Sequence, residues 1–201
     1  GRPFGTIGPP ISIYHPIFSR FQTLIQGDGF DPLPEDVVAA FDLMEAAADF
    51  YETEAHRLNA ITPCLAKLLA RKFHGTSGFD GVTFSETAAK DIPLLVMEAK
   101  NEVGTGGSDP YLHAAFSYRK LWVEGSRLGM RNACCCPGFV LSMAGPYLTI
   151  HGGVSVDNFI VQPLTETLGL ANFPAHFDRA RYIAKIMAAL RICLNEFELF
   201  Y

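Results

Sequence analysis

The segment LLVMEAK, residues 94–100, decides the expected fold and the expected site. An uninterrupted apolar run that ends in charge is typical of a buried central strand. Because alternate residues of a strand share a face, Glu98 and Lys100 are expected to point the same way. Burial of a carboxylate and an ammonium group is costly unless they serve each other or a cation. The segment therefore predicts a charged site at the end of a central strand, with an ordinary Glu98–Lys100 ion pair as the simpler alternative.

A second acid is expected to join this site from the segment FDGVTF, residues 79–84, which predicts a short neighbouring strand. Asp80 and Glu98 would then approach one Mg²⁺ ion, which typically binds one or two carboxylates and keeps several waters. Lys100 would orient or deprotonate the attacking water, or stabilise a phosphate. The competing acid is Asp91, but it lies at the other end of the Glu98 strand, roughly 20 Å away at about 3.3 Å per residue. Asp80 is therefore preferred.

A third acid is expected from the helix that precedes these strands. Glu54 falls on the same helical stripe as Leu58, Ile61 and Leu65, at spacings of four, three and four residues. An acid on a core-facing stripe is unusual, so Glu54 is a candidate metal ligand. The alternative is that Glu54 lies beyond the buried part of the helix.

The remaining pattern predicts an α/β or α+β fold with a mixed sheet flanked by helices. Helices are expected over residues 35–52, 51–73, 110–122 and 174–200, with Pro63 kinking or dividing the second one. Three or four strands are expected between residues 137 and 164. Residues 1–34 are rich in Gly, Pro and aromatics and are expected to form an arm or irregular lead-in, with a short helix near residues 18–26. Residues 35–201 are expected to form the domain itself.

Composition limits the classes of function that fit this chain. It has 201 residues, of which 49% are hydrophobic and 18% charged, and this is enough for one domain with a substantial core. The net charge of −5 excludes a passive basic coat for nucleic acid. A nuclease with this charge would need bound cations and a local basic patch.

Five cysteines, three of them consecutive at Cys134, Cys135 and Cys136, point to a reducing compartment. Neighbours on an extended strand face opposite sides, which is poor disulfide geometry. No CxxC pair supports a zinc site, so small buried side chains are the preferred interpretation. An intracellular location, in nucleus or cytoplasm, is therefore expected. No apolar run reaches the roughly 20 residues of a membrane span, so no membrane partner is expected.

The stretch EAKNEVGTGGSDPYLHAAFSYRKLW, residues 98–122, resembles a domain of fungal proteins with Crinkler-type effector relatives. The resemblance continues through CCCPGFVLSMAGPYLTIHGGVSVDNFIVQPLT, residues 134–165, and spans about residues 51–165. Such domains often precede a divergent protein kinase domain and are regarded as PD-(D/E)XK, restriction-endonuclease-like. The resemblance implies a mixed sheet packed between helices around a metal site.

Carried over by residue, the resemblance places the acid of the second strand at Asp80 and the E-x-K motif at Glu98 and Lys100. The helix acid falls on Glu54. Related nucleases often have Gln in the following helix, where this chain has His113. Histidine can still donate a hydrogen bond to phosphate, but the change puts activity in doubt.

Further substrate contacts are expected around this site. Asn101 would orient Lys100 or bind a metal-bound water, although such residues commonly only solvate a strand end. Arg119 and Lys120, with Arg127 and Arg131, form the densest basic cluster and would hold a nucleic-acid backbone. A solvated helix face explains the same cluster equally well.

The sequence thus predicts a Mg²⁺- or Mn²⁺-dependent nuclease, with DNA favoured over RNA by the resemblance alone. A catalytically inactive module that keeps the nuclease fold, and that binds a partner or regulates an attached kinase domain, is the alternative. A self-associating domain, such as a homodimer, also stays open.

Overall fold

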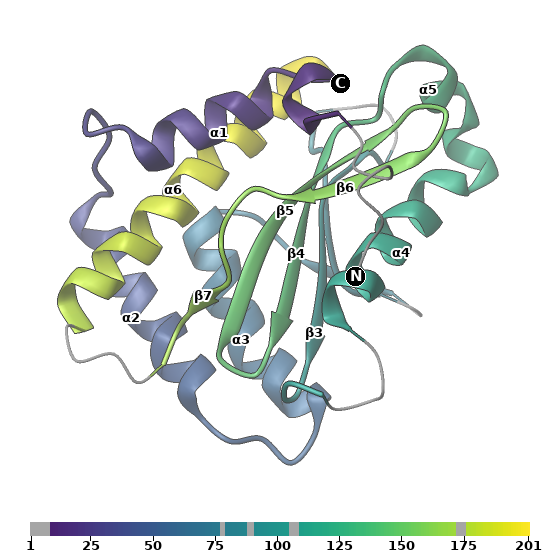
Figure 1. Cartoon of the computed structure of the whole chain (residues 1–201). Coiled ribbons are helices and arrows are strands. Elements are labelled where there is room, and N and C mark those ends of the chain that lie inside the picture. Colours follow the sequence, from purple (N-terminus) through teal and green to yellow (C-terminus); the bar gives the residue numbers. More distant parts are fainter. Residues whose placement is uncertain (1–8, 77–78, 88–90, 105–108, 172–175) are drawn as a thin grey trace.

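A mixed, open sheet forms the centre of the molecule (Figure 1). This computed structural model describes residues 9–76, 79–87, 91–104, 109–171 and 176–201. The strands of the sheet are β1 (His74–Thr76), β2 (Phe79–Phe84), β3 (Pro93–Lys100), β4 (Gly138–Ala144), β5 (Tyr147–Ser155), β6 (Phe159–Pro163) and β7 (Leu168–Gly169). They lie in the order β1-β2-β3-β4-β5-β6, with β7 also paired to β5. The β3–β4 pair is parallel and the other pairs are antiparallel. The expected mixed sheet flanked by helices is therefore confirmed.

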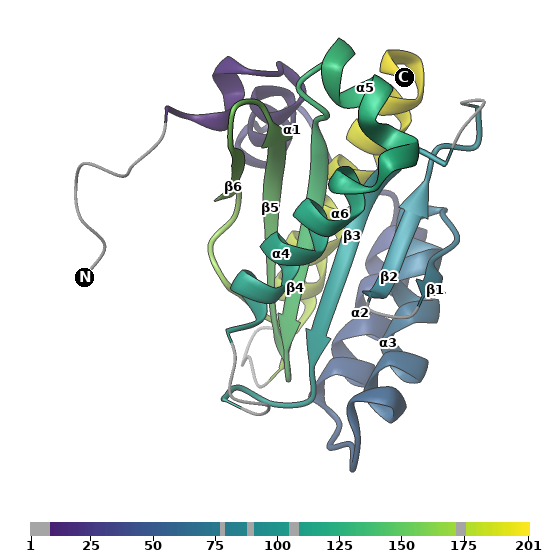
Figure 2. The same ribbon diagram turned by 90° about the vertical axis from the view of Figure 1, so that its right-hand side faces the viewer.

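Helices cover both faces of this sheet (Figure 2). One face carries α1 (Ile17–Gln26), α2 (Pro34–Ala48), α3 (Glu54–Leu69) and α6 (His176–Phe200). The other face carries α4 (Pro110–Val123), which connects β3 to its parallel neighbour β4 and is followed by the short helix α5 (Leu128–Ala133). A connection between adjacent parallel strands needs such a crossover.

Local sequence explains where the helices begin. Pro34 is the first residue of α2, and the Asp36 carboxylate accepts a hydrogen bond from the Leu33 amide at 3.2 Å. Asp109 is the N-cap residue of α4, directly before a proline, and its carboxylate accepts a hydrogen bond of 2.8 Å from the Tyr111 amide. These starts agree with the predicted ones. Pro63 lies inside α3, which is one helix, so of the two expected effects of this proline, a kink or a division, the division is excluded.

The described part of the lead-in contributes to the hydrophobic core. A short 3-10 helix, Ile11–Ile13, precedes α1, and the Phe18 and Phe21 rings of α1 are completely buried. Phe18 meets Phe139 of β4 and Phe197 of α6 edge to face. Residues 1–8 of the expected arm lie outside the described residues, as does Pro174, where the last helix was expected to begin.

Two consecutive glycines in β5 allow helices to approach both faces of the sheet. A Cβ atom on Gly152 would lie 2.6 Å from Cε1 of Phe18, and one on Gly153 would lie 2.8 Å from Cζ of Tyr118. Phe18 belongs to α1 and Tyr118 to α4, which lie on opposite sides of the sheet. The alternation of faces along a strand therefore explains why both positions need glycine.

Several elements differ from the prediction. No strand was expected at His74–Thr76, which pairs with β2 as an edge strand. Of the three or four strands expected between residues 137 and 164 there are three, and β5 is continuous from Tyr147 to Ser155. The short elements β7 and α5 were not anticipated. The strand β7 depends on its pairing with β5, from which it is separated in sequence by β6, and local periodicity does not report such a partner.

The five cysteines are free thiols, and Cys136 is buried while Cys134 and Cys135 are partly exposed. Trp122 and Tyr118 of α4 are buried in the core. Among the described residues, no helix has the length and apolar character needed to span a bilayer.

Candidate functional site

The ends of β2 and β3 bring two acids together on one face of the sheet. The antiparallel register pairs Gly81 with Met97, and continuing it by one residue places Asp80 opposite Glu98. Directly opposed side chains in an antiparallel pair lie about 5 Å apart at their Cβ atoms. The Asp80 Oδ2 atom also accepts a hydrogen bond of 2.7 Å from the Ala99 amide. Asp91 is exposed and lies before β3, at the far end from Glu98.

Glu98 faces α4 and is almost completely buried, with 5% of its surface exposed. The Ser117 hydroxyl of α4 donates a hydrogen bond of 2.5 Å to its Oε1 atom. Ser117 was not singled out from the sequence, since a serine inside a helix gives no signal of its own. It lies one helical turn after His113, the residue expected to act from this helix.

Burial raises the pKa of both carboxyl groups, and Asp80 raises that of Glu98 further, whereas the hydrogen bond with Glu98 lowers that of Asp80. Burial, followed by the charge and the hydrogen bond of Asp80, raises the pKa of Glu98 to about 7, against the opposing hydrogen bond from Ser117. Burial is also the largest cause that raises the pKa of Asp80, and the nearby Glu54 charge adds to it. The positive charge near the Asp80 and Glu98 carboxylates is therefore too small to offset the cost of burying them.

Lys100 supplies a cation beside this pair, and Glu54 holds it in place. The Lys100 Nζ atom lies 3.1 Å from Oε2 of Glu54, which is at the first residue of α3. The Lys100 side chain is 14% exposed and that of Glu54 is 37% exposed. The charge of Lys100 lowers the pKa of Asp80 and of Glu98, which shows that it acts on both acids. All four predicted residues thus meet at one place, although Glu54 bonds the lysine in this structure.

Arg57 anchors the start of α3 to the end of β3, and it was missed from the sequence. Its side chain is 1% exposed, and its guanidinium donates to Asn101 Oδ1 at 3.3 Å and to Glu102 Oε1 at 2.9 Å. It also donates to the Ala47 and Asp49 carbonyls and lies over the Tyr51 ring. Asn101, expected to orient Lys100, instead holds Arg57 and the Tyr51 carbonyl, the latter at 2.6 Å. An arginine in a helix is usually exposed to solvent, so the sequence alone did not indicate that Arg57 is a buried anchor.

A divalent cation fits the chemistry of this cluster. Two converging carboxyl groups with raised pKa values gain the counter-charge they lack when a cation binds. Among the described residues, no three His, Cys, Asp or Glu side chains are arranged to hold a metal ion. Asp80 and Glu98 would therefore supply two ligands and water the others, which is a common arrangement for Mg²⁺. The role of Glu54 as a third ligand stays a prediction.

A groove on α4 adjoins the cluster through Ser117. It has a volume of about 440 Å³ and is lined by His113, Arg119 and Lys120, among others. The Lys120 Nζ atom lies 4.7 Å from the centre of the Phe79 ring, and His113 and Arg119 are exposed. These three residues, which were predicted to contact substrate, therefore share one surface next to the acids.

The other two arginines of the predicted basic cluster do not share this surface. Arg127 donates to the Asp91 and Leu121 carbonyls and pairs with Glu124. Arg131 packs over the Phe159 ring. Their contacts are with the protein's own backbone and rings, so the cluster of four predicted from sequence is divided.

Comparisons with models of known families, with curated proteins and with solved structures found no match for this chain.

Proposed function

We propose that this chain is a metal-dependent nuclease of the PD-(D/E)XK type, acting on DNA in preference to RNA. The observation that carries the proposal is the convergence of Asp80, Glu98 and Lys100 at the adjoining ends of β2 and β3. Two acids and one amine, next to a groove with basic side chains, are the groups that phosphodiester hydrolysis requires.

The order of elements supports the same proposal. A helix precedes a three-stranded antiparallel meander, β1-β2-β3, and a crossover helix then leads to a strand parallel to β3. The resemblance to restriction-endonuclease-like domains implies a mixed sheet packed between helices around a metal site, and this order of elements agrees with it. The acids lie on the strands of the meander and Glu54 on the helix before it, as the resemblance requires.

Each residue has a defined part in the proposed reaction. Asp80 and Glu98 would hold Mg²⁺ or Mn²⁺, which when bound supplies an activated water and polarises the phosphate. The Lys100 ammonium would stabilise the negative charge that develops on the phosphate oxygens. Glu54 positions that ammonium through the 3.1 Å contact. Arg119, Lys120 and His113 would hold the phosphate backbone along the α4 groove.

The test is cleavage of plasmid DNA and of RNA with Mg²⁺ or Mn²⁺ by the wild-type chain, Lys100→Ala and Asp80→Asn. Each substitution is expected to reduce the rate at least about 100-fold, because a group that stabilises the transition state is lost. Lys67→Ala and Asp42→Asn are matched controls, since Lys67 and Asp42 form an exposed ion pair on α3 and α2. Equal cleavage by the wild type and both site variants would refute the proposed catalytic site.

A non-catalytic module that keeps this fold is the second candidate. It is favoured by the Glu54–Lys100 ion pair, which occupies the lysine without a metal, and by histidine at position 113. Such a module would bind a partner or regulate an attached kinase domain. Calorimetric titration with Mn²⁺ separates the two candidates. A nuclease should bind the ion at a site that Glu98→Gln removes, whereas a wild-type chain that binds no Mn²⁺ would support the module.

A further inference from the structure

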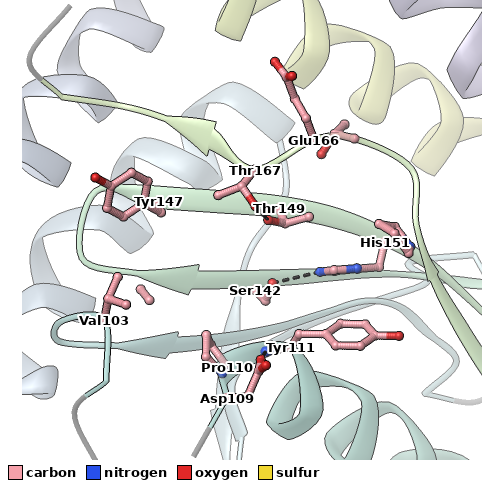
Figure 3. Close-up of a pocket in the computed structure, with 13 residues that line it drawn as sticks. Val103, Asp109, Pro110, Tyr111, Ser142, Tyr147, Thr149, His151, Glu166 and Thr167 are labelled. Atoms are coloured by element: carbon pink, nitrogen blue, oxygen red, sulfur yellow. Dashed lines mark hydrogen bonds between the residues drawn. The ribbon is translucent and has the colours of Figure 1, made fainter. Parts of the chain in front are cut away.

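A second cavity lies on the α4 side of the sheet, between the first turn of α4, strands β4 and β5, and the segment that follows β6 (Figure 3). Its volume is about 600 Å³, within the range of small-molecule sites. Tyr147 stands at one end of it and is half-exposed, while Ser142 and His151 line its sheet wall. The proposed hydrolytic residues do not line this cavity, so it needs an explanation of its own.

This cavity adjoins the acid cluster through the sheet register. Ser142 is the direct partner of Glu98 on the neighbouring parallel strand, and Ala144 is the partner of Lys100. Both partners line the cavity. Neighbouring strands lie about 4.8 Å apart, and register partners point to the same face. A molecule in the cavity would therefore lie one strand away from the proposed reaction centre.

The sheet wall of the cavity carries a buried polar pair. The His151 Nε2 atom lies 2.8 Å from the Ser142 hydroxyl, and the Tyr111 ring lies 4.7 Å from the imidazole. His151 is only 3% exposed, and its Nδ1 atom has no hydrogen-bond partner among the described residues. Burial lowers the pKa of His151 to about 4, so the ring is neutral at pH 7 and is a weak base. The Ser142–His151 pair is therefore better suited to hydrogen-bond the polar edge of an uncharged ligand than to abstract a proton.

The charges around the cavity exclude a phosphate as its occupant. No Lys or Arg is present among the described residues that line it, whereas Asp109 and Glu166 are. Much of the remaining lining is apolar or aromatic, including Pro110, Pro163 and Tyr147. The walls therefore suit a neutral flat ring, because the charged side chains among the described lining residues, Asp109 and Glu166, would repel an anion.

Several hydroxyl groups line the same space. Thr149 and Thr167 bond each other at 3.2 Å, and the Thr165 hydroxyl accepts from the Ile150 amide at 3.1 Å. Each hydroxyl keeps further hydrogen-bonding capacity, because it has one donor and two acceptor positions. Together with Ser142 and His151, these hydroxyl groups offer more hydrogen-bonding positions than the aromatic side chain of a bound protein partner could occupy. A nucleobase carries several donors and acceptors on the edge of a flat ring.

We propose that this cavity receives one unstacked nucleobase, beside the phosphodiester bond that the Asp80–Glu98–Lys100 cluster would hydrolyse. The proposal rests on the proposed nuclease function. Tyr147 would stack on the ring at the rim, and Ser142, Thr149 and His151 would meet its polar edge. The phosphate stays outside, next to Lys100.

The experiment is a titration of the full chain with the free nucleosides, followed by calorimetry or by NMR shifts. Nucleosides contain no phosphodiester bond, so binding is measured without reference to cleavage. At least one nucleoside is expected to bind saturably, and Tyr147→Ala to weaken it at least about fivefold through lost stacking. Thr149→Val, which keeps the side-chain shape, is expected to weaken it as well. Phe50→Ala is the matched control, because Phe50 is an exposed aromatic residue after α2 that lines neither this cavity nor the α4 groove.

Three results would overturn the base site: no nucleoside binds, neither cavity variant weakens binding, or Phe50→Ala weakens it instead. Tighter binding of N-acetyl tyrosinamide or N-acetyl tryptophanamide than of nucleosides would also overturn it, in favour of a peptide partner. The two proposals fail separately. A chain that binds nucleosides in this manner but cleaves nothing refutes the nuclease alone, and a chain that cleaves without binding a nucleoside refutes the base site alone.

Discussion

Glu98 shows how one buried side chain connects stability with function. It is placed between Asp80 and Ser117 under α4, where burial disfavours its charged form. A residue selected for stability alone would be apolar at this position, as its neighbours on β3 are. An ionised carboxylate at this position is therefore costly, and the proposed cation would offset that cost; buried acids with perturbed pKa values are common at functional sites.

This interpretation predicts a pH dependence of stability. A carboxyl whose pKa is higher in the folded chain favours folding at low pH, and that contribution is lost as the pH rises through its folded value. For Glu98, this stabilising contribution decreases between pH 4.5, the ordinary pKa of the side chain, and about pH 7, its pKa in the folded chain. At about 1.4 kcal/mol per unit, it is on the order of 3 kcal/mol. Glu98→Gln should therefore gain stability relative to the wild type between pH 4.5 and pH 8, measured by urea denaturation in EDTA.

The control for this comparison is Glu45→Gln, because Glu45 is exposed on α2. Its stability relative to the wild type should be the same at both pH values. A constant difference between wild type and Glu98→Gln across the pH range would show that Glu98 keeps an ordinary pKa.

At the scale of elements, the contact between α3 and β3 determines whether Glu54 reaches Lys100. Arg57 makes that contact from one turn inside α3, through Asn101 and Glu102 at the end of β3. The site is therefore supported by a buried guanidinium that itself lies outside it. Such a residue acts on the reaction only by holding two elements together.

Arg57→Ala is expected to lower the free energy of unfolding by about 3–5 kcal/mol, because it leaves buried polar partners without their donor. Chemical denaturation followed by tryptophan fluorescence measures this loss. Arg20→Ala is the comparison, since the Arg20–Glu196 pair is exposed and such pairs contribute at most about 1 kcal/mol. Equal losses in the two variants would contradict the anchoring role of Arg57.

At the scale of the whole molecule, the order of the chain differs from its arrangement in space. The early helix α1 packs on the last helix, α6, and contacts the middle of the sheet through Phe18. Residues distant in sequence thus complete the face opposite to α4. The described part of the lead-in is therefore part of the helical layer on this face of the sheet.

Phe18→Ala should therefore behave as a core mutation. It is expected to reduce the free energy of unfolding by about 3–5 kcal/mol, the usual cost of replacing a buried phenylalanine by alanine. Thermal and urea denaturation both measure it. Ile13→Ala changes an exposed residue of the same segment and should stay within about 0.5 kcal/mol of the wild type. A small effect of Phe18→Ala would mean that α1 is an arm in solution.

The sequence by itself determined which residues lie on the same face of β3 and which segment pairs with this strand. Alternation along a strand is local, so Glu98 and Lys100 had to share a face, and a short turn made β2 the neighbour of β3. The helix starts at Pro34 and Pro110 were equally local, since a cap depends on the few residues around it. These short-range rules were sufficient to select Asp80, Glu98, Lys100 and Glu54 as one group.

Only the tertiary structure decided what surrounds that group. Ser117 and Arg57 reach the site from helices, and the Ser142–His151 pair lies one strand away on the sheet. Their roles depend on how α4, α3 and β5 pack, which is set by burial across the whole chain and leaves no period in the local sequence. For the same physical reason, no local pattern indicated that the described part of the lead-in packs on α6.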